Sequence, residues 1–370
     1  MQIKSMQMKY ITSTLRLALL AITLGATVFG AASSFVATAY AAEHAANPAV
    51  GQSVAHSVAT EKADSNEVDR WLGRMNDAFA ELDYDGVFSY WSGGNMSSLR
   101  VVHVTKDGVE HERLVHLNGA PREIVREGEK VLCILQPGDK LVAMGGSIPA
   151  GPFARAFIRD FSDVSSHYDL SMRGSGRIAG RAAVRLSVKA RDEHRYGYRL
   201  WLDKETGLLL KSELMDEGHN TALEVFQFSQ VVIGSKVDHA ALEPEQPNGS
   251  VIDHLQVADE SDSASHPDVK WHADWLPEGF EMASSDMRHA PATKQDVSTL
   301  MYSDGLAAIS VFVEDMPNAA ATNMMTRTGA TVSVTRLVHG PDKKRHLVTV
   351  IGEVPPKTAA AIATKVSYSK

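Results

Sequence analysis

The sequence YGYRLWLDKETGLLLKSELMDEGHNTALEVFQFSQVVI, residues 196–233, decides the fold of the larger part of the chain. It predicts three β-strands joined by two tight turns, at residues 203–207 and 216–220. Gly207 and Gly218 lie where such turns need a residue with positive φ. The flanks are rich in Tyr, Trp, Leu, Val and Phe, which favour a pleated, half-buried surface. A meander of this kind needs further strands and an apolar cover, which the rest of the chain is expected to supply.

The segment that begins at Tyr84 has the same alternation of apolar and polar residues. Together with the meander it predicts a sheet of about eleven strands, and short consecutive hairpins favour antiparallel pairing. The upstream strands are expected near residues 84–91, 96–105, 109–117, 121–126, 130–136, 139–143, 166–173 and 181–190. Glycine-containing turns separate most of them, for example Asp107-Gly108 and Asn118-Gly119.

Two helices are expected to accompany this sheet. Apolar residues recur at helical spacing on one face of the segment after residue 64, at Val68, Trp71, Leu72, Met75, Phe79 and Leu82. A shorter helix is predicted over residues 152–165, where Phe153, Phe157 and Phe161 form one apolar stripe. The sheet then either closes around packed side chains or curls around a cavity. The stripe is either ordinary core or a lining for an acyl chain.

The N-terminus has the pattern of an export signal, predicted to span residues 1–42. Lys4, Lys9 and Arg16 precede an apolar run, and Ala39-Tyr40-Ala41 offers a cleavage site. An uncleaved membrane anchor is the alternative, since the run is nearly long enough to span a bilayer. Residues 43–66 are alanine-rich and polar, which favours a disordered leader. The mature protein is therefore expected in the periplasm.

Composition limits the class of protein. A chain of 370 residues has room for about two domains, and its formal net charge of -8 gives no electrostatic case for nucleic-acid binding. Cys133 is the only cysteine, which excludes an intrachain disulfide and a cysteine-based metal site.

A domain boundary is expected near residue 243. Residues 243–269 contain prolines, an Asn-Gly pair and a run of acidic and serine residues, a composition that favours a linker. The linker would join a domain at 67–242 to a second unit at 270–370. A short apolar island at Val251–Leu255 interrupts the linker. The second unit is predicted to be a small α+β domain with a helix from Pro355-Pro356. Its strands are expected near residues 278–288, 296–303, 306–314, 331–338 and 345–352.

No motif assembles an active site. The chain lacks the G-x-S-x-G elbow of serine hydrolases. Residues 174–179 match a dinucleotide fingerprint, but they open a strand and not a helix. His103, His111 and His116 follow no metal-ligand spacing, so exposed strand histidines are favoured over a metal site. These observations favour an exported binding protein that has no cofactor and is not an enzyme.

Short motifs in both domains resemble the MucB/RseB family, and the resemblance covers roughly residues 68–368. The motifs are YDGVF (84–88), RVVH (100–103), ERL (112–114), LNGAPRE (117–123), YRLWLD (198–203), WLPEGF (275–280) and YSDGLA (302–307). The resemblance implies a periplasmic negative regulator of a sigma-E-type envelope-stress response. Such a protein binds the periplasmic part of a membrane anti-sigma factor of the RseA/MucA type and shields it from a DegS-type protease.

The resemblance also implies an N-terminal domain similar to the lipoprotein carriers LolA and LolB. That fold is a half-open antiparallel barrel covered by helices. Lipopolysaccharide or lipoprotein acyl chains are then the expected signal that releases the anti-sigma factor. A lipid or lipoprotein carrier without a regulatory partner is the alternative, and the sequence leaves a homo-oligomer open.

Candidate binding residues follow as hypotheses. Acyl chains are expected against Phe153, Phe157, Phe161, Trp201 and Phe226. The anti-sigma factor is expected on the second domain and the linker, partly by strand addition. The candidates for that contact are Tyr302, Asp304, Arg336, Lys343, Lys344 and Arg345. A solvated turn explains the run at 343–345 equally well.

Overall fold

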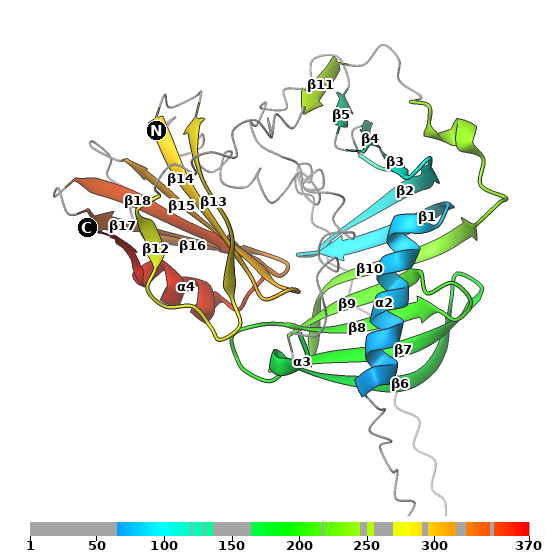
Figure 1. The fold of residues 1–370 in the computed structure, drawn as a ribbon, viewed down its shortest axis with the longest axis horizontal. Helices are drawn as coiled ribbons and strands as arrows, with labels where there is room; N and C mark the ends of the chain where they lie inside the picture. Colours follow the sequence, from blue (N-terminus) through cyan, green and yellow to red (C-terminus); the bar gives the residue numbers. More distant parts are fainter. Residues whose placement is uncertain are drawn as a thin grey trace, which may run out of the picture.

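The computed structural model describes residues 65–369, except 120, 129, 136–163, 217, 245–249, 255–268, 291–294, 316–322 and 341–343. Two sheet-based domains lie side by side, the larger with an eleven-stranded sheet and the smaller with a six-stranded one (Figure 1). The signal segment 1–42 lies outside the described residues, as do residues 43–64 of the expected leader. The helix expected over 152–165 lies outside them too, apart from the start of the short helix α3 (Val164–His167).

The large sheet consists of two consecutive antiparallel meanders. The first contains β1 (Tyr84–Ser92), β2 (Asn95–Lys106), β3 (Val109–His116), β4 (Arg122–Glu127) and β5 (Lys130–Leu135). The second contains β6 (Tyr168–Ile178), β7 (Arg181–Ala190), β8 (Gly197–Asp203), β9 (Leu209–Asp216) and β10 (Thr221–Ile233). In the order β11-β5-β4-β3-β2-β1-β10-β9-β8-β7-β6, β1 pairs with β10 and so joins the two meanders. The predicted large antiparallel sheet is confirmed.

The eleventh strand differs from the predicted one. The strand expected over 139–143 lies outside the described residues. The sheet instead gains β11 (Ser250–His254), which pairs antiparallel with β5 and coincides with the apolar island of the predicted linker. A short 3-10 helix, η1 (His239–Leu242), precedes it. Part of the 243–269 segment is therefore an edge strand of the large sheet.

The two turns of the 196–233 stretch use different residues for the left-handed conformation. Gly207 has a φ of 87°, as predicted, and a Cβ there would lie 2.8 Å from the carbonyl oxygen of Arg74. The prediction for Gly218 is wrong, because Asn220 takes the positive φ of 48° instead. Asn tolerates this region better than most side chains. Its Oδ1 accepts a hydrogen bond of 2.8 Å from Arg199 Nη2, which holds the turn against β8.

The helix α2 (Ser65–Glu81) covers one face of the large sheet and crosses its strands (Figure 1). Its apolar stripe places Val68, Leu72 and Met75 fully within the core, together with Leu186 of β7 and Leu200 of β8. The prediction of an amphipathic helix is thus confirmed. The prediction that several helices cover the sheet goes too far for the described residues, in which α2 is the one long helix packed on this sheet.

The smaller domain is a six-stranded antiparallel sheet in the order β13-β14-β15-β18-β17-β16, with helix α4 (Pro356–Thr364) packed against β17 and β18. Its strands are β13 (Glu281–Ala290), β14 (Gln295–Ser303), β15 (Ala308–Asp315), β16 (Met324–Thr328), β17 (Thr331–His339) and β18 (Arg345–Gly352). Two features of this domain were not predicted: β16, and a small ribbon made of β12 (Trp271–Ala273) and β19 (Val366–Tyr368). Strands this short carry too little alternation to be recognised.

The pairing of β1 with β10 is expected to fail when a side chain is added at Gly86. A Cβ there would lie 2.5 Å from Phe228 Cε1 and 2.8 Å from the carbonyl oxygen of Gln230. Because both neighbours belong to β10, Gly86→Ala should destabilise the protein by about 1–3 kcal/mol, as other overpacked sites do. Urea denaturation followed by tryptophan fluorescence measures the change.

The matched control is Gly73→Ala in α2, where a new Cβ meets no atom within 4 Å. This variant should be about as stable as the wild type or up to about 1 kcal/mol more stable, since Ala favours helix. Equal stability of Gly86→Ala and the wild type would contradict the strain argument.

Candidate functional site: the junction of the two domains

The loop between β7 and β8 directs an arginine into the smaller domain. The Arg195 side chain is fully buried, and its Nη1 forms an ion pair of 2.7 Å with Asp304 Oδ2, which is equally buried. Arg195 Nη2 donates a hydrogen bond of 2.6 Å to the carbonyl oxygen of Glu278. Its Nη2 also lies 3.0 Å from Asp192 Oδ2 in the same loop. One guanidinium thus joins a loop of the large domain to two segments of the small one.

Asp304 is the acceptor at the centre of this contact. Its Oδ1 accepts backbone hydrogen bonds from Leu306 (2.9 Å) and Ala307 (2.7 Å), which close the turn between β14 and β15. Its Oδ2 also accepts a hydrogen bond of 2.8 Å from the hydroxyl of Tyr168, at the start of β6. Burial, and secondly the charge of Asp304, hold the pKa of Tyr168 well above its ordinary value. The hydroxyl therefore stays a donor at every physiological pH.

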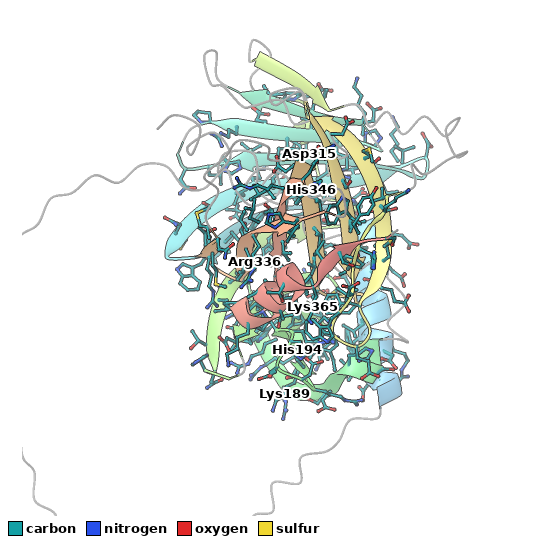
Figure 2. All side chains as sticks on the ribbon, turned by 90° about the vertical axis from the view of Figure 1, so that its left-hand side faces the viewer. Lys189, His194, Asp315, Arg336, His346 and Lys365 are labelled. Atoms are coloured by element: carbon teal, nitrogen blue, oxygen red, sulfur yellow. The ribbon has the colours of Figure 1, made fainter. Side chains whose placement is uncertain are left out.

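Apolar and aromatic groups surround the ion pair. The Arg195 guanidinium lies over the rings of Tyr168 (5.5 Å) and Phe280 (5.2 Å). Beside it, the His194 ring meets Trp275 edge-on at 5.3 Å, and its Nδ1 lies 3.3 Å from Thr358 Oγ1 of α4. Figure 2 labels His194 and, at the opposite end of α4 from Thr358, Lys365. Exclusion of water by these rings strengthens the ion pair.

A second contact involves Glu224 of β10. Its Oε1 accepts a hydrogen bond of 3.0 Å from the backbone N–H of Ala330, in the turn between β16 and β17. Ser92 Oγ donates to the same oxygen at 3.1 Å, and the Tyr90 hydroxyl donates to Oε2. Burial raises the pKa of Glu224, although the three hydrogen bonds oppose the rise. The small domain therefore touches the large one at two separate turns of its sheet.

Glu353, just after β18, is a second carboxyl group at this contact. Burial, and secondly the charge of Glu224, raise the pKa of Glu353 to about 8. Two carboxyl groups that share a site cannot both ionise without repulsion. The junction thus contains one well-paired charge, at Arg195, and one titratable acidic pair.

The predicted partner-binding residues lie in different environments. Tyr302 is buried in the core of the small domain, where its hydroxyl accepts a hydrogen bond of 3.1 Å from the backbone N–H of Ala273. Asp304 is buried in the junction. Arg336 and Arg345 are half-buried on β17 and β18, Lys344 is exposed, and Lys343 lies outside the described residues. The structure brings only Asp304 to the junction, and the predicted contact with a partner stays a prediction.

The predicted lipid-binding residues are also dispersed. Phe226 is buried in an aromatic cluster with Phe88 (4.9 Å) and Phe228 (5.1 Å). Trp201 is half-buried on the other side of β8, in strand alternation with the buried Leu200 and Leu202. Phe153, Phe157 and Phe161 lie outside the described residues. The face of the sheet at Phe226 is therefore covered by packed side chains. Lipid binding stays a prediction.

Three residues of the junction were not predicted from the sequence: Arg195, Glu224 and Glu353. Glu224 gives a recognisable signal, because it alternates with Phe226 and Phe228 and so places a carboxylate on the buried face of β10. Arg195 and Glu353 give none, since both lie in irregular segments beside many other charges. Two motifs of the family resemblance, WLPEGF and YSDGLA, supply Trp275, Glu278, Phe280 and Asp304 to this junction.

Within the described residues, no three His, Cys, Asp or Glu side chains are grouped so that they could hold a metal ion. None of the helices in that part of the chain has the length and apolar character needed to cross a membrane.

The MucB/RseB N-terminal domain model matches residues 67–246, and the MucB/RseB C-terminal domain model matches residues 265–367. The chain belongs to the MucB/RseB family. It is 37% identical over 309 residues to the sigma factor AlgU regulatory protein MucB of Pseudomonas aeruginosa, which covers 83% of this chain and 92% of that protein. It is 28% identical over 298 residues to the sigma-E factor regulatory protein RseB of Escherichia coli K12, and that alignment covers 80% of this chain and 89% of RseB. Family members of this kind are thus sigma-factor regulators.

Solved structures of the family match both domains together. The MucA/MucB complex of Pseudomonas aeruginosa has a TM-score of 0.69 at 33% identity, covering 82% of this chain and 99% of that one. A crystal structure of MucB in complex with MucA(peri) scores 0.67 at 34% identity, with the same coverage. A crystal structure of MucB scores 0.57 at 32% identity, covering 82% and 98%.

Removal of the buried guanidinium should separate the two domains. Arg195→Ala leaves Asp304 buried without its cation, and breaking such a pair costs about 3–5 kcal/mol. Urea denaturation should therefore show a large loss of stability. Limited proteolysis should show faster cleavage between the domains.

The control is Arg191→Ala, four residues earlier in the same loop. Arg191 pairs with Asp169 at 2.8 Å, but the two side chains are 49% and 65% exposed. An exposed pair contributes about 1 kcal/mol or less. Similar losses for both variants would show that burial of the Arg195 pair is not what matters.

The acidic pair predicts a pH dependence with a definite sign. The folded pKa of Glu353 lies near 8, above its ordinary value of 4.5, so the folded state holds its proton more tightly than the unfolded state. The contribution of Glu353 to the unfolding free energy is therefore greatest below pH 4.5 and decreases as the pH rises towards 8. Glu353→Gln should remove this decrease.

Urea midpoints of the wild type and Glu353→Gln, measured from acidic to slightly alkaline pH, test the point. The difference between the two proteins should grow in favour of Glu353→Gln as the pH rises. Glu281→Gln, at an exposed position of β13, is the control and should track the wild type. A difference that does not change with pH would contradict the assignment.

Proposed function

We propose that this chain is a periplasmic negative regulator that acts by binding and not by catalysis. It binds the periplasmic part of a membrane anti-sigma factor of the MucA type and shields it from the initiating protease. The observation that carries the proposal is the match across both domains to family structures solved as complexes with MucA. The export signal expected over residues 1–42 supports the location.

The domain junction is the element that partner binding would use. The TM-scores to the two MucA complexes, 0.69 and 0.67, exceed the 0.57 to the crystal structure described as MucB. This difference supports the view that the arrangement held by Arg195 and Asp304 is the partner-binding one. A ligand can shift such an arrangement only by its difference in affinity for the two states. Contacts at the junction thus set how strongly a signal must act to release the partner.

Lipid is the proposed releasing signal. Acyl chains would enter between the large sheet and the Phe153, Phe157 and Phe161 stripe expected over residues 152–165. Burial contributes about 0.8 kcal/mol per CH₂, so one acyl chain is sufficient to shift a domain arrangement. Linkage requires the converse effect: if lipid weakens partner binding, the partner weakens lipid binding by the same factor.

Retention of the anti-sigma periplasmic domain on the immobilised protein tests the proposal. The wild type should retain its partner, and saturating lipopolysaccharide should reduce retention. Arg195→Ala should retain less than the wild type without any lipid, because its domains are no longer held together. Arg191→Ala should retain as much as the wild type.

The outcomes separate regulation from lipid transport. A protein that binds lipopolysaccharide but never retains the anti-sigma domain would be a carrier, and the regulatory role would be rejected. Retention that saturating lipid leaves unchanged would reject the release step alone. Equal retention by Arg195→Ala and the wild type would show that the junction plays no part in binding.

A further inference from the structure

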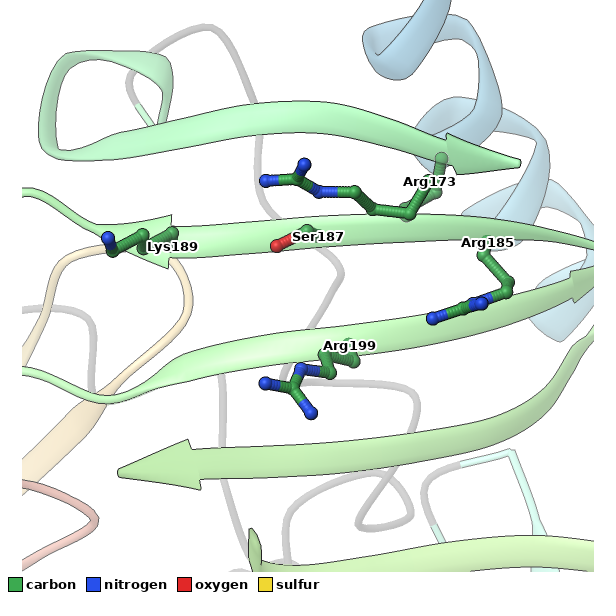
Figure 3. Close-up of a pocket in the computed structure, with 6 residues that line it drawn as sticks. Arg173, Arg185, Ser187, Lys189 and Arg199 are labelled. Carbon is green, nitrogen blue, oxygen red and sulfur yellow. The ribbon is translucent and has the colours of Figure 1, made fainter. Parts of the chain in front are cut away.

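A hollow of about 330 Å³ opens on the large sheet, over strands β6, β7 and β8. It is lined by Arg173, Arg185, Leu186, Ser187, Lys189 and Arg199 (Figure 3). In Figure 3 Ser187 lies between Arg173 on one side and Arg199 on the other, with Lys189 and Arg185 towards the two ends. The sequence motifs gave no indication of this set, because its members come from three strands.

The hollow lies on the face of the sheet that α2 does not cover. Leu186 and Leu200 point into the core that α2 closes and are almost completely buried. Because successive strand residues point to opposite faces, Arg185, Ser187 and Arg199 point the other way. Ser187 and Arg199 are cross-strand partners, and so are Arg185 and Trp201. The register therefore places these groups together on one open face.

Positive charge exceeds negative charge around the hollow. Arg199 lies 3.8 Å from Glu213, but Glu213 is also bound by Lys211 at 2.8 Å. Asp169 is the cross-strand partner of Lys189 and is paired with Arg191. Within the described residues, none of the ion pairs involves Arg173, Arg185 or Lys189. Four cations thus line the hollow, and each of the two carboxylates beside it is paired with a further cation, Arg191 or Lys211.

Trp201 fixes the edge of the hollow. Arg185 lies over its ring at 5.4 Å and Lys211 at 4.7 Å. The backbone of Gly176 in β6 approaches so closely that a Cβ there would lie 3.3 Å from Trp201 Cδ1. The ring is therefore held between the two cations and the neighbouring strand. It packs against Arg185, which lines the hollow.

The donors match one class of ligand. Guanidinium groups present planar forks of N–H donors that fit phosphate oxygens, and a serine hydroxyl adds a further donor. A volume of 330 Å³ lies at the lower end of the range for small-molecule sites, so it has room for a phosphorylated headgroup. The excess of cations favours an anion with more than one negative charge, such as a phosphate monoester.

We propose that this hollow, defined by Arg173, Arg185, Ser187, Lys189 and Arg199, is a binding site for phosphate monoesters. The terminal phosphate group that a monoester presents occurs in the headgroup of a phosphorylated lipid, and free inorganic phosphate or pyrophosphate presents the same group without an ester bond. The inference deepens the proposed lipid recognition by naming the chemical group recognised and the face that recognises it. Its failure would leave binding of the anti-sigma factor untouched.

Binding of the full mature chain to three kinds of vesicle tests the site. The vesicles are phosphatidylcholine alone, phosphatidylcholine with phosphatidic acid (a monoester), and phosphatidylcholine with phosphatidylglycerol (a diester). Sedimentation should show preferential binding to the phosphatidic acid vesicles, weakened by added salt. Titration calorimetry with inorganic pyrophosphate, without vesicles, tests the free anion.

The double variant Arg173→Gln with Arg199→Gln should bind at least about tenfold more weakly, since hydrogen bonds to charged groups are lost. The control is Arg177→Gln, an exposed arginine of the same strand β6 that donates to the carbonyl oxygen of Gly180 outside the hollow. It should bind like the wild type. Thermal unfolding of each variant verifies that the fold is retained.

Each outcome decides the proposal. Binding of both probes, or of pyrophosphate alone, assigns a general phosphate site, and binding of phosphatidic acid vesicles alone assigns a lipid headgroup site. Three results would overturn it. They are no binding of either probe, equal binding of diester and monoester vesicles, and equal losses of binding in the double variant and Arg177→Gln. Binding of an acidic peptide without phosphate would also overturn it. Retention of the anti-sigma domain by the double variant, measured in parallel, shows whether the proposed regulatory role stands independently.

Discussion

One ion pair removed from water links the two domains and restricts how they can be arranged. Arg195 and Asp304 are fully buried and lie 2.7 Å apart. Transfer of two charges from water costs free energy that attraction alone offsets poorly. Here the cost is reduced because the carboxylate also accepts from Tyr168, Leu306 and Ala307. A contact of this kind gives little net stability to the correct arrangement but strongly disfavours any arrangement in which the charges remain buried and apart.

The junction accordingly favours two states over a continuum. With the pair formed, the turn between β14 and β15 is fixed against the loop before β8. With the domains apart, water solvates both charges. Intermediate separations leave one charge desolvated without its partner and are therefore poorly populated. The Glu224 and Glu353 pair adds an opposing contribution that depends on pH, because burial disfavours both carboxylates. A regulator whose partner favours one state gains a sharp response from such a contact.

Local sequence was sufficient for the strands but not for the junction. Alternation over residues 84–135 and 168–233 predicted each strand there, because one face of the sheet is buried and the period is two. The turn at 216–220 was assigned to the wrong residue, since Asn220 and Gly218 are both compatible with a left-handed conformation. The role of Arg195 depends on a residue more than one hundred positions away, and Arg173 reaches its neighbours only through strand register. Pairings of this kind are decided by the topology of the fold. Local residue patterns do not specify which distant segments meet.

The pairing of β1 with β10 also has a consequence for the order of folding. Tyr90 and Glu224, which meet across these strands, are 134 residues apart. After the first meander has emerged, β1 would present an unpaired edge until almost the whole second meander has followed. Closure of so long a loop is slow, and an open strand edge invites association with other chains. Until β10 has formed, the first half of the large domain thus depends on assistance against aggregation.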